Sequence, residues 1–176
     1  RKVVRDLLGV TGLKQLIGTT VLVLRVCRGK TVETGTLPLH LERRAAIKMV
    51  LGTLITNAAL FGFLYAIGHP WLYLLWFGAW MTTNKLVARV RAIAEHAVIP
   101  DPADPMKHTR TVEAGWLERV FIAPNFVQYH LEHHLLMTVP HYNLPRFHKM
   151  LEERGLLSDA CVANSYAQVL RKAVAA

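Results

Sequence analysis

A run of uncharged residues from Met49 to Ile67 constrains the fold of this chain more than any other feature of its sequence. At a rise of about 1.5 Å per residue, a helix of that length reaches roughly 28 Å, close to the ~30 Å hydrocarbon core of a bilayer. The residues Gly68-His69-Pro70 end the run, because proline cannot continue a helix and glycine favours a helix end. The run therefore predicts one membrane-spanning helix.

A second apolar run, Trp71 to Met81, follows this break at once and continues in a more polar form to Arg89. A connection this short returns the second helix antiparallel to the first. We therefore expect an integral-membrane helical hairpin over residues 45–90, with a buried helical pair in a soluble bundle as the alternative. Because the charge-free part of the second helix is short, the helix would be tilted, with the Lys85 amine reaching the interface.

Basic residues stand at both outer ends of this hairpin, while its tip carries only His69. The positive-inside rule places such ends in the cytoplasm, and aromatic residues crowd the tip as they do at membrane interfaces. The pattern predicts a multi-pass membrane protein whose outer ends lie on the cytoplasmic side. The basic residues are Arg43, Arg44, Lys48, Lys85, Arg89 and Arg91, and the aromatic ones are Trp71, Tyr73 and Trp76.

The segments on either side of the hairpin are more polar. Residues 1–44 contain a broken apolar stretch, Leu13–Val26, with cationic flanks, which favours an interfacial amphipathic helix over a short buried one. Residues 91–176 begin with a loop rich in proline at 99–105, and helices are expected near 114–123, 145–155 and 161–174. The sequence thus predicts an all-α protein, with an interfacial or cytosolic region at 1–44 and a cytosolic helical cap at 91–176.

The composition agrees with a membrane protein. Hydrophobic residues make up 52% of the 176 residues, yet the formal net charge is +9. The basic residues flank apolar runs and do not gather on one polar face, so nucleic-acid binding is not expected. Cys27 and Cys161 lie in unlike contexts, which predicts two free thiols.

Seven of the nine histidines lie between positions 96 and 148, and three of them form the pattern His130-Leu131-Glu132-His133-His134. On a helix, positions i, i+3 and i+4 share one face, so the three imidazoles would converge and Glu132 would point away. Neutral imidazole suits iron, copper, zinc and nickel. A metal site is the favoured interpretation, because clustered cations repel and buried unpaired imidazoles are costly; a solvated polar face is the alternative.

The spacing argues against two common metal sites. Zinc hydrolases use H-E-x-x-H or H-x-x-E-H, and here Leu131 and Glu132 stand at the wrong places for either pattern. A membrane haem would need paired histidines inside the spanning helices, whereas the hairpin carries only His69, at its tip.

The surroundings of the histidines resemble a known family. Residues 125–145, N-F-V-Q-Y-H-L-E-H-H-L-L-M-T-V-P-H-Y-N-L-P, resemble the third histidine box, H-x-x-H-H, of the membrane fatty-acid desaturases, with its downstream x-P-x-Y-x-L-P. Residues 91–97, R-A-I-A-E-H-A, resemble a segment that follows the last spanning helix in many bacterial members. Asp104-Pro105 and Thr109-Arg110-Thr111 fit the linker between the two, and the similarity covers most of residues 1–155.

The resemblance implies two iron ions held by histidines from several segments. It implies His130, His133 and His134 as metal ligands, and His96 as a further ligand. The remaining histidines of this region do not match ligand positions and are expected at the surface or behind the ligands. These are His108, His141 and His148, and the residues expected to orient the imidazoles are Glu95, Asn125, Gln128 and Glu132.

The implied activity is the oxygen-dependent introduction of a double bond into an acyl chain. Electrons would come from a ferredoxin-type or cytochrome-type protein, and the basic cytosolic face would attract an acidic donor. Two alternatives remain open. The same ligands serve a di-iron hydroxylase of a lipid or small molecule, and a membrane protein without enzymatic activity would also retain the box.

The chain departs from the family in one respect. The family carries two further histidine boxes N-terminal to this region, whereas residues 1–90 contain only His40 and His69. We therefore expect residues 1–176 to be the C-terminal part of one desaturase domain, unable by themselves to hold two irons and inactive without the rest.

Overall fold

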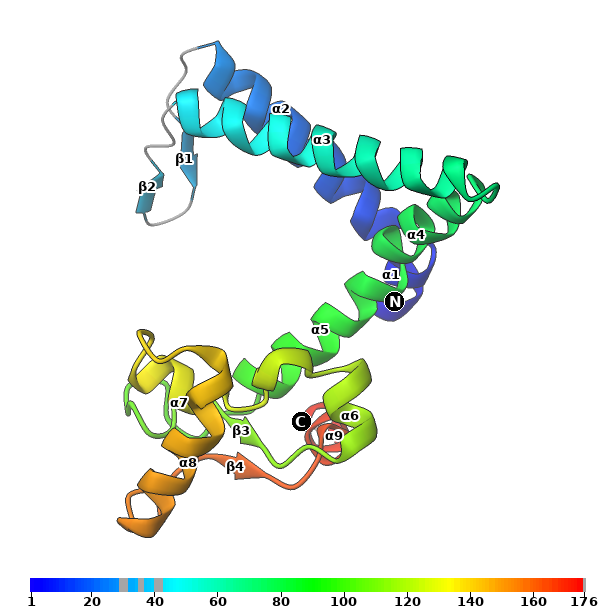
Figure 1. The fold of residues 1–176 in the computed structure, drawn as a ribbon. Helices are drawn as coiled ribbons and strands as arrows, with labels where there is room; N and C mark the ends of the chain where they lie inside the picture. The colour runs from blue at the N-terminus through cyan, green and yellow to red at the C-terminus, as the bar shows by residue number, and fades with distance from the viewer. Residues whose placement is uncertain (29–31, 35–36, 40–42, 176) are drawn as a thin grey trace. The chain divides into compact units, whose positions relative to one another are not determined.

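The computed structural model describes residues 1–28, 32–34, 37–39 and 43–175, which are mostly helical (Figure 1). The chain divides into two compact units, Arg1–Leu86 and Val87–Ala176. The predicted predominance of helix is confirmed. The all-α prediction did not include two small sheets, β1 with β2 and β3 with β4.

The first unit contains the apolar helices. Its elements are α1 (Lys2–Leu7), α2 (Val10–Cys27), β1 (Val32–Thr34), β2 (Leu37–Leu39), α3 (Arg43–Ala66), α4 (Leu72–Met81) and the first residues of α5 (Thr83–His96). Strands β1 and β2 are antiparallel, with Val32 opposite Leu39. Helices α2 and α3 lie side by side (Figure 1).

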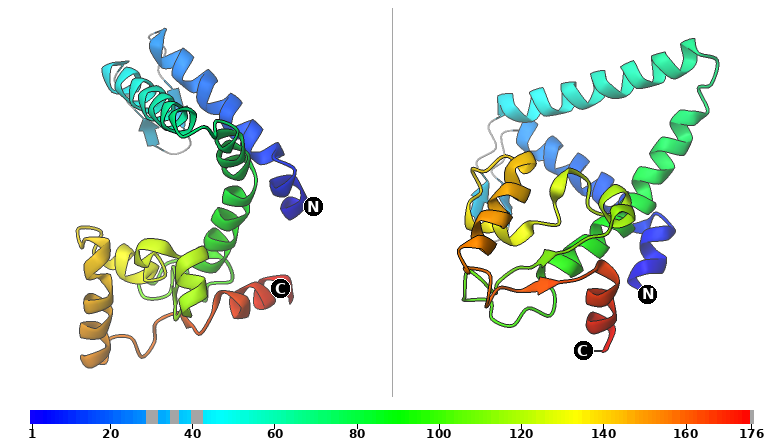
Figure 2. Two further views of the ribbon diagram at one scale, coloured as in Figure 1. Left: turned by 45° about the vertical axis from the view of Figure 1, so that its right-hand side comes forward. Right: turned by 60° about the horizontal axis from the view of Figure 1, so that its bottom comes forward.

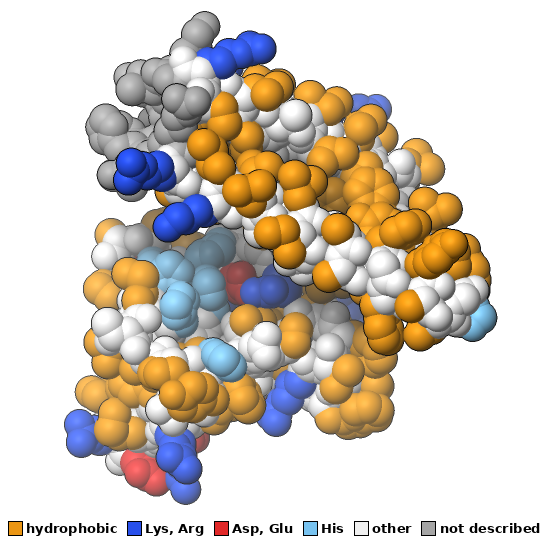
Figure 3. Space-filling view, turned by 45° about the horizontal axis from the view of Figure 1, so that its top comes forward, with side chains coloured by type: hydrophobic (Ala, Val, Ile, Leu, Met, Phe, Trp, Pro, Cys, Tyr) orange, Lys and Arg blue, Asp and Glu red, His pale blue; other side chains and the backbone are white. Residues whose placement is uncertain are grey.

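Among the described residues, two helices are long and apolar enough to span a membrane, α2 and residues 44–66 of α3. Only 11% of the apolar window in α2 and 6% of that in α3 is buried, whereas a core helix of a soluble protein is mostly buried. Hydrophobic side chains make up much of the visible surface of this unit (Figure 3). Thr20, Thr53 and Thr56 donate their hydroxyls to carbonyls one turn back, which satisfies polar groups that lipid cannot.

Helix α3 matches the predicted span at Met49–Ile67, and α2 is a second candidate for a membrane-spanning helix. Leu13–Val26 was predicted to lie at the membrane interface, whereas α2, which contains it, meets the length and composition of a span. The two cationic flanks used for that interfacial assignment lie at its ends, where a spanning helix also carries them. The two apolar helices indicate a membrane protein.

The predicted break after the first apolar run is confirmed. Gly68 adopts a left-handed φ of +80°, and α4 leaves the turn so that the chain reverses direction (Figure 2). The Tyr73 hydroxyl donates to Asn57 Oδ1 at 2.8 Å, and the Tyr73 ring meets Phe61 edge-on with centroids 5.6 Å apart. These contacts fasten α4 to α3.

The second arm of the hairpin differs from the predicted single helix. Helix α4 ends at Met81 and α5 begins at Thr83, because Thr82 leaves the helical region at φ −118° and ψ −84°. The Thr82 and Thr83 hydroxyls donate to the carbonyls of Gly78 and Ala79, a back-bonding that bends helices. At about 1.5 Å per residue, α4 reaches only about 15 Å and is too short to span a bilayer by itself.

Helix α2 packs against the end of α4 at Gly12. A side-chain carbon placed on Gly12 would overlap the Met81 carbonyl oxygen and lie 2.7 Å from the Met81 Cα. Only glycine permits backbones to approach this closely, as at other helix contacts in membranes.

The second unit continues from α5. Its elements are β3 (Thr111–Val112), α6 (Trp116–Phe121), the 3₁₀ turn η1 (Pro124–Phe126), α7 (His130–Leu135), η2 (His141–Asn143), α8 (Leu144–Glu153), β4 (Val162–Ala163) and α9 (Tyr166–Ala175). The helix expected from residue 161 begins at Tyr166, because Val162 and Ala163 pair in parallel with Thr111 and Val112.

Four alanines, two valines and one tyrosine form the core of the second unit. They bring the end of α5 together with β3, β4 and α9, and His96 follows this core as the last residue of α5. Cys161, next to β4, is a free thiol, as is Cys27, in agreement with the prediction. The core residues are Ala94, Val112, Ala114, Ala123, Ala163, Tyr166 and Val169.

We predict that Gly12→Ala separates α2 from α4 and costs about 1–3 kcal/mol, as overpacking does. Gly18, also on α2, has no atom within 4 Å of an added side-chain carbon, so Gly18→Ala is the matched control and should be neutral or stabilising. Thermal unfolding of the protein in detergent micelles measures both. Equal midpoints for the two variants would contradict the packing.

Candidate metal centre

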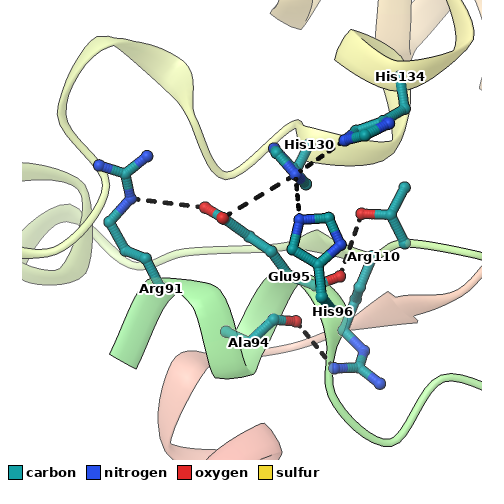
Figure 4. Close-up of polar contacts among 8 residues, drawn as sticks. Arg91, Ala94, Glu95, His96, Arg110, His130 and His134 are labelled. Carbon is teal, nitrogen blue, oxygen red and sulfur yellow. Dashed lines mark hydrogen bonds and ion pairs between the residues drawn. The ribbon is translucent and has the colours of Figure 1, made fainter. Parts of the chain in front are cut away.

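Three histidines converge where α5 ends and α7 begins (Figure 4). His130 Nε2 lies 3.0 Å from His96 Nε2 and 3.1 Å from His134 Nε2. One nitrogen from each ring falls within 4.8 Å of the other two. His96 is the last residue of α5, whereas His130 and His134 stand one turn apart on α7, so the cluster joins segments 34 residues apart in the sequence.

Arg110 and Thr109 hold the end of α5 in place. The buried guanidinium of Arg110 donates to the carbonyls of Ala94, Ala97 and Val98 at 2.7–3.0 Å. Figure 4 shows the bond to Ala94. The buried Thr109 hydroxyl donates to the Glu95 carbonyl at 3.0 Å. The last carbonyls of a helix have no partner within the helix, and a cation there also suits the helix dipole.

The protonation state of the cluster suits metal binding. Burial, then the neighbouring His134 and His96, lower the pKa of His130 to about 3. Burial and the neighbouring histidines also lower the pKa of His134. Both rings are therefore neutral at neutral pH, which is the form that binds a metal without losing a proton.

The carboxylate of Glu95 lies beside the cluster. Its Oε2 lies 3.9 Å from His130 Nε2, and its Oε1 lies 3.4 Å from Arg91 Nε (Figure 4). Because His130 is neutral, the Glu95–His130 contact is not an ion pair. Glu95 is buried and adds negative charge beside the three imidazoles.

The donor set fits a first-row transition metal. Two imidazole nitrogens 3.0 Å apart must share a hydrogen atom or face a common cation, since two lone pairs at that distance would repel. Imidazoles with a nearby carboxylate suit iron, zinc, copper and nickel, whereas calcium and magnesium prefer oxygen ligands.

The described residues thus bring together three of the four predicted ligands. His133, the fourth, is exposed, with its ring centroid 6.0 Å from that of His130 and 5.9 Å from that of His134. At i+3 from His130 it lies on the flank of α7, beside the cluster and outside the group of converging nitrogens.

Of the four residues expected to orient the imidazoles, one lies beside the cluster and three lie elsewhere. Glu95 lies beside His130, as expected. Glu132 points away from the cluster, as the helical spacing predicts, and contacts Thr111 and His148. Asn125 is exposed with φ +57°, and Gln128 is buried without a side-chain partner among the described residues.

His108, expected at the surface or behind the ligands, has its ring 5.2 Å from the His134 ring. Two buried residues near the cluster were not foreseen from the sequence. Arg110 and Thr111 were assigned only to a linker, and no pattern in their polar surroundings signals that both are buried. His141 is exposed against Tyr142, as expected for a surface residue.

We predict that replacing His96, His130 or His134 by alanine removes a metal ligand and lowers the metal affinity at least about tenfold. Loss of a residue that only orients a ligand already lowers metal affinity by about that factor. His141→Ala is the matched control and should bind metal as the parent protein does. Chelator competition and elemental analysis of the purified protein measure the affinity. Unchanged affinity in all three variants would show that the cluster binds no metal.

A second prediction concerns His148, whose Nδ1 donates to Glu132 Oε1 at 2.6 Å. This hydrogen bond raises the pKa of His148 above 6.5 in the folded protein. The pair therefore stabilises fully below about pH 6.5 and less as the pH rises through the raised pKa. His148→Gln should lower the unfolding temperature most at low pH, and a difference that stays constant from about pH 6 to about pH 9 would contradict this.

Comparison with protein families agrees with this geometry. The model of the family described as fatty acid desaturase matches residues 2–161, which include every residue of the cluster and both apolar helices. No curated protein and no solved structure matches the chain. Since the family match covers most of the sequence, the chain belongs to the fatty acid desaturase family.

Proposed function

We propose that the protein is an oxygen-dependent di-iron desaturase that introduces a double bond into the acyl chain of a lipid. The observation that carries this proposal is the convergence of His96, His130 and His134 in a chain whose family match covers residues 2–161. Family membership implies an oxidoreductase with a di-iron centre, and the specific reaction is our proposal.

The cluster residues would hold iron. His96, His130 and His134 present one ring nitrogen each toward one point, and His133, on the flank of α7, would serve the second ion. When bound, the irons supply oxygen activation and the removal of hydrogen from an unactivated carbon. The protein supplies the ligands, the negative charge of Glu95 and the fixed ends of α5 and α7.

Two irons need more ligands than this cluster provides. Residues 1–90 contain only two histidines, His40 and His69, and so carry no further histidine box. We propose that the remaining ligands come from two further histidine boxes in a longer chain, of which residues 1–176 form the C-terminal part.

The surroundings suit an acyl substrate. Helices α2 and α3 have the length and composition of spans, and an acyl chain dissolved in the bilayer reaches such a protein from the lipid. We propose that the histidine cluster faces the cytoplasm, because the basic residues Lys85, Arg89 and Arg91 follow the apolar run of α4. A ferredoxin-type or cytochrome-type protein would supply the electrons there.

The test is product analysis by mass spectrometry. The full-length gene product, expressed with an electron donor, should convert acyl chains into products lighter by two hydrogens, and only when oxygen is present. His134→Ala should abolish the product, whereas His141→Ala, the exposed control, should retain it. A product heavier by one oxygen would show that the protein is a hydroxylase and not a desaturase. Unchanged lipids from an iron-loaded protein would contradict both activities.

A further inference from the structure

Glu132 lies within the histidine box, yet its side chain is fully buried on the opposite side of α7. Its two oxygens each accept a short hydrogen bond. Oε2 accepts from the Thr111 hydroxyl at 2.5 Å, and Oε1 accepts from His148 Nδ1 at 2.6 Å. Burial of a carboxylate is costly unless such partners are present, so the three side chains must stay together.

Both partners of Glu132 are themselves fixed. Thr111 is fully buried in β3, where its N–H donates to the Cys161 carbonyl at 3.0 Å. His148 belongs to α8, and its ring packs against Tyr129 with centroids 5.0 Å apart. Glu132 therefore ties α7 to a strand on one side and to a helix on the other.

Helix α7 depends on such ties because it has only six residues. A helix that short is not stable by itself in water. Its buried residues are Leu131 and Glu132, which are adjacent and so define one side of the helix. Leu131 contributes apolar contact, which is not directional, whereas the hydrogen bonds of Glu132 have a required geometry.

The helical spacing connects Glu132 to the ligands. His130 and His134 stand two residues before and two residues after it, and at about 100° per residue each points roughly 200° around the helix from Glu132. A rotation of α7 about its axis would therefore move both imidazoles away from His96 together. The contacts of Glu132 oppose that rotation.

We propose that Glu132, held between Thr111 and His148, is a positioning residue that sets the rotation of α7 and thereby aims His130 and His134 at a common metal ion. The proposal rests on the proposed iron site and adds a residue that does not touch the metal. This role agrees with the hydrogen bonds of Glu132, which go to Thr111 and His148 and not to the three histidines of the box.

Substitution of Thr111 tests this without changing a charge. Thr111→Val keeps the branched shape and removes the hydroxyl, whereas Thr111→Ser keeps the hydroxyl. Glu132→Gln weakens both hydrogen bonds, and Glu153→Gln, at an exposed glutamate of α8, is the matched control. The readouts are the cobalt(II) affinity of the full-length protein, its cobalt absorption spectrum at saturation, and the unfolding temperature of the metal-free form.

A positioning role predicts that Thr111→Val and Glu132→Gln lower cobalt affinity about 10–100-fold and alter the saturated cobalt spectrum. Thr111→Ser should restore both, and Glu153→Gln should change neither. A lower unfolding temperature with parental affinity and spectrum would show a merely structural role and overturn the proposal. Absence of cobalt and iron binding in the parent protein would instead overturn the iron site itself.

Discussion

The histidine cluster depends on the contact of Arg110 with the carbonyl oxygens at the end of α5. His96 is the last residue of that helix, where unpaired carbonyls normally let a helix fray. The guanidinium occupies the carbonyls of Ala94, Ala97 and Val98, and Thr109 occupies that of Glu95. Without these bonds, His96 would not stay in place opposite α7.

The two sides of α7 carry side chains in different charge states. On one side, burial and mutual proximity keep His130 and His134 neutral, so that their lone pairs are available to a cation. On the other side, the charged Glu132 raises the pKa of His148 and binds it. The same short helix therefore presents neutral donors to the site and a paired charge to the protein interior.

Features that depend on a local pattern could be predicted from the sequence. The charge-free run predicted α3, and the i, i+4 spacing predicted that His130 and His134 share a face. The pairing of Thr111 with Val162 joins residues far apart in the chain, and neither this pairing nor the burial of Arg110 could be predicted. His133 fulfils the helical pattern but stays outside the converging group, because α5 approaches α7 from the side of His130 and His134.

X-ray absorption at the iron edge of the purified full-length protein shows whether these histidines hold iron. We expect about two irons per chain with imidazole nitrogen ligands, and a weaker imidazole signal in His96→Ala than in the parent. A protein that binds no iron, or iron whose imidazole signal is the same in parent and variant, would contradict this expectation.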